Sequence, residues 1–320
     1  MRERSHDHER LVHSIVQSPT SAATSPLAAS WCRSALRHGL DPGHVRARTS
    51  VSEAELRQLH EANEPLLVVA RPILDQLFAT VGDSGCAVVL SDADGLILAA
   101  RAGPADQDMF EEVGLIPGAI WSEAAEGTNG IGTCLAEKRA VTIHRDQHFA
   151  CRNIGISCMD APVYNPQGRL VAALDMSSCR NDHGEAMATL VGAVVRDAAR
   201  RIEREFFQAA YSHARILVAP NHGMQGNALL AVDRDDIVIG ASHAARVRYG
   251  LTDEALARPR TAADVLGQPE APSFEEAERA TLRQALAQAR GNASEAARIL
   301  GIGRATLYRR LQRHRLRPPA

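Results

Sequence analysis

The chain has 320 residues, of which 45% are hydrophobic and 23% are charged, and its formal net charge is −2. This balance is typical of a soluble globular protein with two or three domains, and it excludes a fibre or a largely disordered chain. The polar start at residues 1–10 has no apolar segment of a signal peptide, and no stretch is apolar enough to span a membrane. We therefore expect a cytoplasmic protein whose six cysteines are reduced thiols.

Residues 1–60 form a polar, helical N-terminal lead-in. Breaks are expected at Ser18-Pro19 and Ser25-Pro26, because proline interrupts regular structure. After the second break, residues 27–42 are expected to form a short amphipathic helix that includes Trp31. Gly39 closes this helix and Pro42 stops it.

Residues 61–212 are predicted to form an α+β domain. A helix over 64–78 leads into a strand, an Asp/Gly turn and a second strand at 86–99, which is the pattern of a hairpin. The same pattern recurs at 161–176, a further strand covers 140–143, and a long helix covers 185–207. The expected fold is an antiparallel sheet with flanking helices.

The long helix at 185–207 carries an apolar stripe with charged residues on either side. At ~1.5 Å rise per residue it is long enough to extend past its own domain and pair with a second copy. Packing on its own sheet is the alternative. We predict a homodimer.

Three stretches connect this domain to a known family. They are Trp121-Ser122-Glu123, the glycine-rich run 126–134 that includes Thr128 and Asn129, and the run 141–149 that ends at Phe149. Together with the lead-in, they resemble the GAF domains of acetoin-regulator-like activators. The resemblance implies a sensor domain that binds an unidentified small-molecule effector and needs no cofactor. Its pocket would be lined by Trp121, Thr128, Asn129, Phe149, Cys158 and Asp175.

Two other interpretations of this domain stay open. His144, His148 and Cys151 have a spacing that could supply three metal ligands, but a fourth is not identifiable, so we predict no metal. Cys151 and Cys158 could instead form a redox pair.

Residues 213–268 are predicted to form a small PAS-like α/β connector. Residues 227–242 show a strand, an acidic turn and a strand, and a helix follows at His243–Tyr249. Residues 268–272, with two prolines, are expected to be a linker.

Residues 269–320 are predicted to form an all-α helix-turn-helix domain. A helix from residue 274 to 289 is followed by a second at 293–300, with Ser294 near its start as a cap. Gly301-Ile302-Gly303 forms the turn, and a third helix covers 304–313 with Leu307 and Leu311 facing the first two. Ala297 is small enough to let the helices cross closely.

The charge of this region favours DNA as its partner. From Arg298 to Arg317 there are seven arginines and no acidic residue. The stretch 291–311 resembles the C-terminal domain of the factor for inversion stimulation and of sigma-54 enhancer-binding activators. That resemblance implies a dimer whose recognition helix enters the major groove. The implied contacts to DNA are Arg304, Thr306, Tyr308, Arg309 and Arg313, with Asn292 and Ser294 near phosphates.

Sigma-54 activators carry an ATPase domain between sensor and helix-turn-helix, with a Gly-x4-Gly-Lys-Ser/Thr loop. The single lysine of this chain, Lys138, is followed by Arg139, so we expect no such loop and no ATP-driven promoter opening.

We therefore predict a transcriptional regulator, not an enzyme, that binds double-stranded DNA and responds to a small molecule without ATPase activity. A full-length activator or RNA polymerase is a further expected partner, and a membrane is not. The alternatives are a cysteine-based redox sensor or thiol enzyme, and an antagonist that forms mixed dimers with a full-length activator.

Overall fold

The computed structural model describes residues 2–18, 20–23, 25–44, 47–180, 182–219, 228–267 and 273–316. Pro19, Asn227, the expected linker at 268–272 and Arg317 lie outside this part of the chain. The chain divides into two compact units, Met1–Arg260 and Thr261–Ala320. None of the described helices is both long and apolar enough to cross a membrane.

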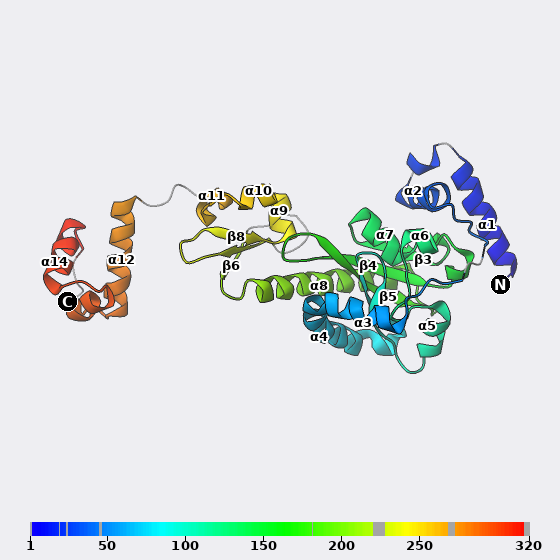
Figure 1. Ribbon diagram of the computed structural model, residues 1–320, viewed down its shortest axis with the longest axis horizontal. Helices are drawn as coiled ribbons and strands as arrows, with labels where there is room; N and C mark the ends of the chain where they lie inside the picture. The colour runs from blue at the N-terminus through cyan, green and yellow to red at the C-terminus, as the bar shows by residue number, and fades with distance from the viewer. Residues whose placement is uncertain are drawn as a thin grey trace. The chain divides into compact units, whose positions relative to one another are not determined.

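A five-stranded antiparallel sheet forms the centre of the first unit (Figure 1). Its strands are hydrogen-bonded in the order β2-β1-β5-β4-β3. Its strands are β1 Cys86–Asp92, β2 Ile97–Arg101, β3 Val141–His144, β4 Ser157–Tyr164 and β5 Leu170–Ser178. All seven residues of β1 are buried. A strand that is buried on both sides requires cover on both faces of the sheet.

Two long helices cover one face of this sheet, α4 Glu64–Val81 and α8 Glu185–Ala210 (Figure 1). Their apolar side chains repeat every three to four residues, which aligns them on one side of each helix. In α8, Val191, Val195 and Ile202 are buried in this layer. The short α3 Glu53–Ala62 precedes α4 and begins with a capping box between Ser52 and Glu55.

The other face is covered by shorter elements: α5 Gln107–Val113, α6 Glu123–Glu126 and α7 Gly130–Glu137. Phe110, Trp121 and Ile131 pack there against Val89 of β1. Single helical turns at Gly82–Ser84, Arg145–Gln147 and Cys151–Asn153 complete the loops.

The N-terminal lead-in packs onto the first unit through α1 Arg2–Gln17 and α2 Pro26–Cys32. A short turn at Ser21–Ala23 joins the two, and α2 continues as a π-helical turn over Arg33–Arg37. Trp31 is 2% exposed and packs against Val12 and Phe149. The lead-in is therefore part of the folded unit.

The rest of the first unit contains a small three-stranded antiparallel sheet. Its strands are β6 Arg215–Val218, β7 Leu229–Val232 and β8 Val238–Ala241, followed by α9 His243–Tyr249 and α10 Asp253–Leu256. The expected hairpin is present, with Asp233 Oδ1 accepting from the backbone N–H groups of Asp235 and Ile237 at 2.9 Å each. The edge strand β6 is an addition that sequence did not indicate, because its residues are only partly buried.

The second unit is helical: α11 Ala262–Leu266, α12 Phe274–Gln288, α13 Ala293–Ile299 and α14 Arg304–Arg313. The three last helices share one apolar core. These observations confirm the predicted fold class, an antiparallel sheet with flanking helices together with an all-α C-terminal unit.

Candidate functional site

The helix α14 is held by its apolar side and exposes the other. Leu307 and Leu311 are 0% and 1% exposed and pack among residues of α12 and α13. They lie four residues apart, so both point to the same side of the helix. The predicted core contacts of this helix are thus present.

A tight turn joins α13 to α14. Gly301 has a φ of +65°, a conformation that glycine adopts without steric cost. The next residue, Ile302, donates its backbone N–H to Ala297 O at 3.0 Å. Ala297 is 4% exposed within the three-helix core, in agreement with the need for a small residue at the crossing.

The start of α13 differs from the sequence-based expectation. Asn292 is the capping residue, since its Oδ1 accepts from the backbone N–H groups of Ser294 at 3.0 Å and Glu295 at 3.2 Å. Ser294, which we expected to cap the helix, is its second residue and is exposed. Asparagine two residues earlier is as good a cap, so the helix begins there.

The residues expected to contact DNA lie on the open side of this unit. Arg304, Tyr308, Arg309 and Arg313 are exposed, and Thr306 is half-buried. Arg304 Cζ lies 5.7 Å from the centre of the Tyr308 ring, and Arg309 Nη2 lies 3.5 Å from Thr306 Oγ1. These contacts are weak, so the cationic groups keep their capacity to bind phosphates or base edges.

One acidic residue fixes α14 to α12. Glu278 accepts from Arg310 Nη1 at 2.6 Å and from His314 Nε2 at 2.8 Å. The hydrogen bond from His314, followed by the charge of Arg310, lowers the pKa of Glu278. Sequence reasoning missed this group because the two partners are 32 and 36 residues away.

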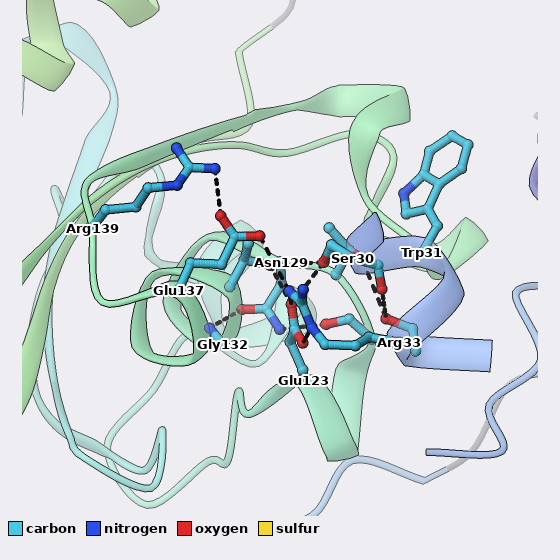
Figure 2. A network of polar contacts seen from close by, with 12 residues as sticks. Ser30, Trp31, Arg33, Glu123, Asn129, Gly132, Glu137 and Arg139 are labelled. Atoms are coloured by element: carbon cyan, nitrogen blue, oxygen red, sulfur yellow. Dashed lines mark hydrogen bonds and ion pairs between the residues drawn. The ribbon is translucent and has the colours of Figure 1, made fainter. Parts of the chain in front are cut away.

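In the first unit, the Trp121–Thr133 segment joins the sheet to the lead-in. Figure 2 shows Arg33 between Glu123 and Glu137. Arg33 donates to both oxygens of Glu123 at 2.7 Å each, and to Glu137 Oε1 at 3.2 Å. Ser30 and Thr133 also donate to Glu123 Oε1, at 2.6 and 3.0 Å. Burial raises the pKa of Glu123, but these donors outweigh it, and the net shift is downward.

A second buried carboxylate organises the neighbouring loop. Glu126 is 3% exposed and accepts from Arg48 Nη1 at 3.3 Å, from Asn153 Nδ2 at 3.1 Å, and from Arg152. Arg48 also lies over the Trp121 ring, with Cζ 5.1 Å from its centre. The two glutamates of the motif thus hold basic side chains from the lead-in and from the loop after β3.

Four of the predicted pocket residues are buried and already have structural contacts. Trp121 donates its indole N–H to Gly114 O at 2.8 Å. Asn129 caps α7 by accepting from Gly132 N at 2.8 Å, and Thr128 Oγ1 lies 2.7 Å from Ser30 Oγ. Phe149 is 1% exposed and packs against Trp31.

The other two, Cys158 and Asp175, belong to a polar cluster inside the sheet. Asp175 is paired with Asp160 on the adjacent strand, and both are nearly fully buried. Ser177 donates to Asp175 Oδ2 at 2.8 Å, and Ser177 Oγ lies 3.2 Å from Cys158 Sγ. His148 Nε2 lies 3.4 Å from the same sulfur. Sequence analysis did not single out Asp160, whose position opposite Asp175 follows only from the strand register.

The two aspartates leave an unusual hydrogen-bonding deficit. Within the described residues, no donor reaches either oxygen of Asp160 or Asp175 Oδ1. Burial, together with the charge of its neighbour, raises the pKa of Asp160 well above its usual value. Burial also raises the pKa of Asp175, to about 7. Below about pH 7 the pair therefore holds a proton, which one aspartate can donate to the other, and the remaining oxygens can still accept.

Comparison with known proteins agrees with both resemblances. The GAF domain family model matches residues 65–202, and that of bacterial regulatory proteins of the Fis family matches residues 273–314.

The chain combines a GAF domain with a Fis-type helix-turn-helix.

The curated relatives that match this chain are named as transcriptional or catabolic regulators. The chain is 32% identical over 222 residues to the acetoin catabolism regulatory protein of Cupriavidus necator, covering 68% of this chain and 33% of that protein. It is 28% identical to the acetoin dehydrogenase operon transcriptional activator AcoR of Bacillus subtilis, covering 47% of this chain and 25% of that protein. The chain thus spans a third or less of the length of these relatives.

A solved structure supports the fold of the first unit. The E. coli DhaR(N)–DhaL complex matches with a TM-score of 0.52 at 16% identity, covering 75% of this chain and 81% of that one. At this identity the match concerns the fold alone.

The GAF domain does not bring together the three residues considered as metal ligands. His144 Nδ1 lies 2.8 Å from Ser157 Oγ, His148 contacts Cys158, and Cys151 Sγ lies 3.3 Å from Ser5 O. Within the described residues, the group compact enough to hold a metal is instead Glu9, His13 and Asp41 on the surface.

The cysteines of the redox hypothesis lie in environments that disfavour the thiolate. Burial raises the pKa of Cys151, and it raises that of Cys158 well above the usual range. A reactive cysteine needs the opposite shift, because the thiolate is the nucleophile. The electrostatics therefore do not favour thiol chemistry in this GAF domain.

Proposed function

We propose that this protein is a DNA-binding transcriptional regulator that responds to a small molecule through its GAF domain and has no ATPase or other enzymatic activity. The observation that carries the DNA-binding part is the exposed, arginine-rich side of α14 in a Fis-type domain whose opposite side is buried. The names of the relatives, which are regulators of catabolic operons, support the same class.

The proposed DNA contacts separate into two kinds. Arg304, Thr306, Tyr308, Arg309 and Arg313 lie on or beside the open face of α14, where base edges in the major groove would be within reach. Asn292 and Ser294, at the start of α13, would lie beside phosphates, because exposed helix N-termini favour anions. Asn292 Oδ1 already accepts the two hydrogen bonds that cap α13, so the amide nitrogen of Asn292 would make the contact to phosphate.

The proposal includes a homodimer, because two recognition helices must be about one DNA turn apart, on the order of 34 Å. Helix α8 supports this arrangement: Leu190 and Val194 are 67% and 41% exposed and lie four residues apart. Exposed apolar pairs on a long helix are suited to pairing with a second copy.

The buried aspartate pair supports the proposed effector response. Cys158 and Asp175 would contact the effector directly, and Trp121, Thr128, Asn129 and Phe149 would enclose it. Because Asp160 and Asp175 have unfilled acceptor positions, the effector should donate hydrogen bonds, as a hydroxyl or amine does. Binding would change the affinity for DNA to the extent that the effector prefers one state of the protein.

The four-part division at residues 60, 212 and 268, the cytoplasmic location and the lack of ATP-driven activity belong to the same proposal. A regulator without its own ATPase would act by occupying DNA, or through RNA polymerase or a full-length activator. No catalytic residue is proposed.

The experiment measures DNA affinity by fluorescence anisotropy with and without each candidate effector, on DNA from upstream of the protein's own gene. We expect at least one hydroxylated small metabolite to change the Kd, and Asp175→Asn to abolish that change without altering the effector-free Kd. An unchanged Kd with every candidate would contradict the sensing part. Equal affinity for all DNA sequences would contradict specific binding.

A further inference from the structure

A cleft of about 190 Å³ lies between the GAF sheet and the β6–β8 module, away from the aspartate pair. It is lined by residues from the loop after α7, the last residues of β4, helix α8 and the start of α9. Neither the proposed DNA contacts nor the proposed effector site includes this cleft.

The cleft is basic. Lys138 and Arg139 come from the loop after α7, and Arg196 and Arg200 come from α8. The two arginines of α8 lie four residues apart, so they project from the same side of the helix. Among the ion pairs formed by described residues, none involves Lys138, Arg196 or Arg200. Arg139 pairs with Glu137, as Figure 2 shows.

The acidic and aromatic residues of the cleft do little to cancel this charge. Glu203 accepts from Tyr164 N at 3.0 Å, and burial raises its pKa to about 7, so it is largely protonated below neutral pH. Burial lowers the pKa of His243, which keeps it neutral. Lys138 and Arg196 therefore face the cleft without a carboxylate partner, while the charge of Arg200 acts on Glu203.

Two stacked rings form one wall of the cleft. Tyr164 and His243 stack with ring centres 3.6 Å apart and planes 7° apart, forming a wall between the two modules. The Tyr164 hydroxyl also donates to the backbone oxygen of Lys138 at 3.1 Å. This hydrogen bond holds Lys138, whose φ of 54° is left-handed. A second cavity, of about 330 Å³, lies along β3 and is also lined by Arg139 and Arg196. The two cavities are therefore neighbours, and a ligand larger than one carboxylate or phosphate group has room there.

We propose that this cleft binds a small organic dianion, with its carboxylate or phosphate groups held by Lys138, Arg196 and Arg200. Arginine forms two-point hydrogen bonds with either group, and lysine supplies a point charge. Binding would connect α8 of the GAF domain to α9 of the β6–β8 module. The site is separate from the proposed effector site, and it does not depend on DNA binding.

The test is isothermal titration calorimetry of the full chain with succinate and with inorganic phosphate, at constant ionic strength. Succinamide, the neutral analogue, is the ligand control. We expect saturable binding of at least one anion, with succinamide inactive. Binding of phosphate alone would point to a phosphate ester, and binding of succinate alone to a dicarboxylate.

Variants then locate the site. Arg196→Gln and Lys138→Asn should each weaken binding at least tenfold; asparagine is chosen because it tolerates the left-handed conformation. Arg200→Lys keeps the charge but loses the two-point hydrogen bonds, so it should bind the anion less tightly than the wild type and more tightly than Arg200→Gln. Arg71→Gln, on the exposed side of α4, is the matched control and should bind like the wild type. No saturable binding of either anion, equal binding of succinamide, or an unchanged affinity in Arg196→Gln would overturn the proposal.

Discussion

Gly130 and Asp160 are packed so closely that a β-carbon on Gly130 would lie 1.9 Å from Asp160 Oδ2. The same atom would lie 2.5 Å from Cys158 Cβ. The first turn of α7 therefore rests directly on the buried aspartate pair. The glycine-rich motif serves close packing over a polar cluster.

Gly130→Ala should destabilise the GAF domain by about 2 kcal/mol, because the neighbours of an overpacked site must shift. Urea unfolding followed by tryptophan fluorescence measures this, since both tryptophans, Trp31 and Trp121, are buried in the first unit. Gly155→Ala is the control, as nothing lies within 4 Å of a β-carbon there. Equal stability of the two variants would show that the contact with Asp160 is easily relaxed.

Asp175→Asn should stabilise the protein at pH 8 and leave it nearly unchanged at pH 4. The pKa of Asp175 is raised to about 7 by burial, so its contribution is fully present at low pH and is lost as pH rises through 7. Wild-type stability should therefore fall by about 1 kcal/mol per pH unit between about 4 and 7 from this group.

The amide carbonyl introduced by Asp175→Asn can still accept from Ser177, and its NH2 group can donate to Asp160. The measurement is urea unfolding at several pH values, with Asp108→Asn on the exposed side of α5 as the control. A variant curve parallel to that of the wild type would argue against a proton held by the aspartate pair.

Arg33→Ala should destabilise the first unit by about 2 to 3 kcal/mol, because it leaves the buried Glu123 carboxylate without its main partner. Since the pKa of Glu123 is lowered in the folded protein, the wild-type contribution is present above the ordinary glutamate pKa and is lost as pH falls through the lowered value. The difference between variant and wild type, measured by thermal unfolding, should thus shrink below about pH 4. Arg37→Ala, one turn later, serves for comparison.

The parts of the fold that could be predicted from the sequence are those that depend on residues close together in the chain. The positions of Gly301, Leu307 and Leu311 define the helix-turn-helix over a short stretch, and the two hairpins carry their own turns. The parts that it could not predict depend on residues far apart. Arg33 and Glu123 are 90 positions apart, and Asp160 acquires meaning only when the β4–β5 register places it beside Asp175. The sequence pattern marked the glycine-rich motif as a site, while its glutamates turn out to bind the lead-in.

Ala297→Leu should unfold the C-terminal unit or lower its stability by about 2 to 3 kcal/mol, since the side chain is 4% exposed where α13 meets α14. Far-UV circular dichroism during heating measures the loss of helix. Ala305→Leu, on the exposed side of α14, introduces the same group without the crowding. If both variants unfold like the wild type, the crossing has more room than its geometry indicates.

The account predicts that α14 reads DNA sequence. The most direct test is a salt series of binding to the protein's own upstream DNA and to random DNA, for wild type, Arg304→Ala and Arg279→Ala. Arg279 lies on the exposed part of α12 and is the charge-matched control. We expect Arg304→Ala to lose about 1 to 3 kcal/mol on the upstream DNA but little on random DNA, and Arg279→Ala to bind like the wild type on both. Equal binding of all three proteins to every sequence, with affinity set by salt alone, would contradict the central claim.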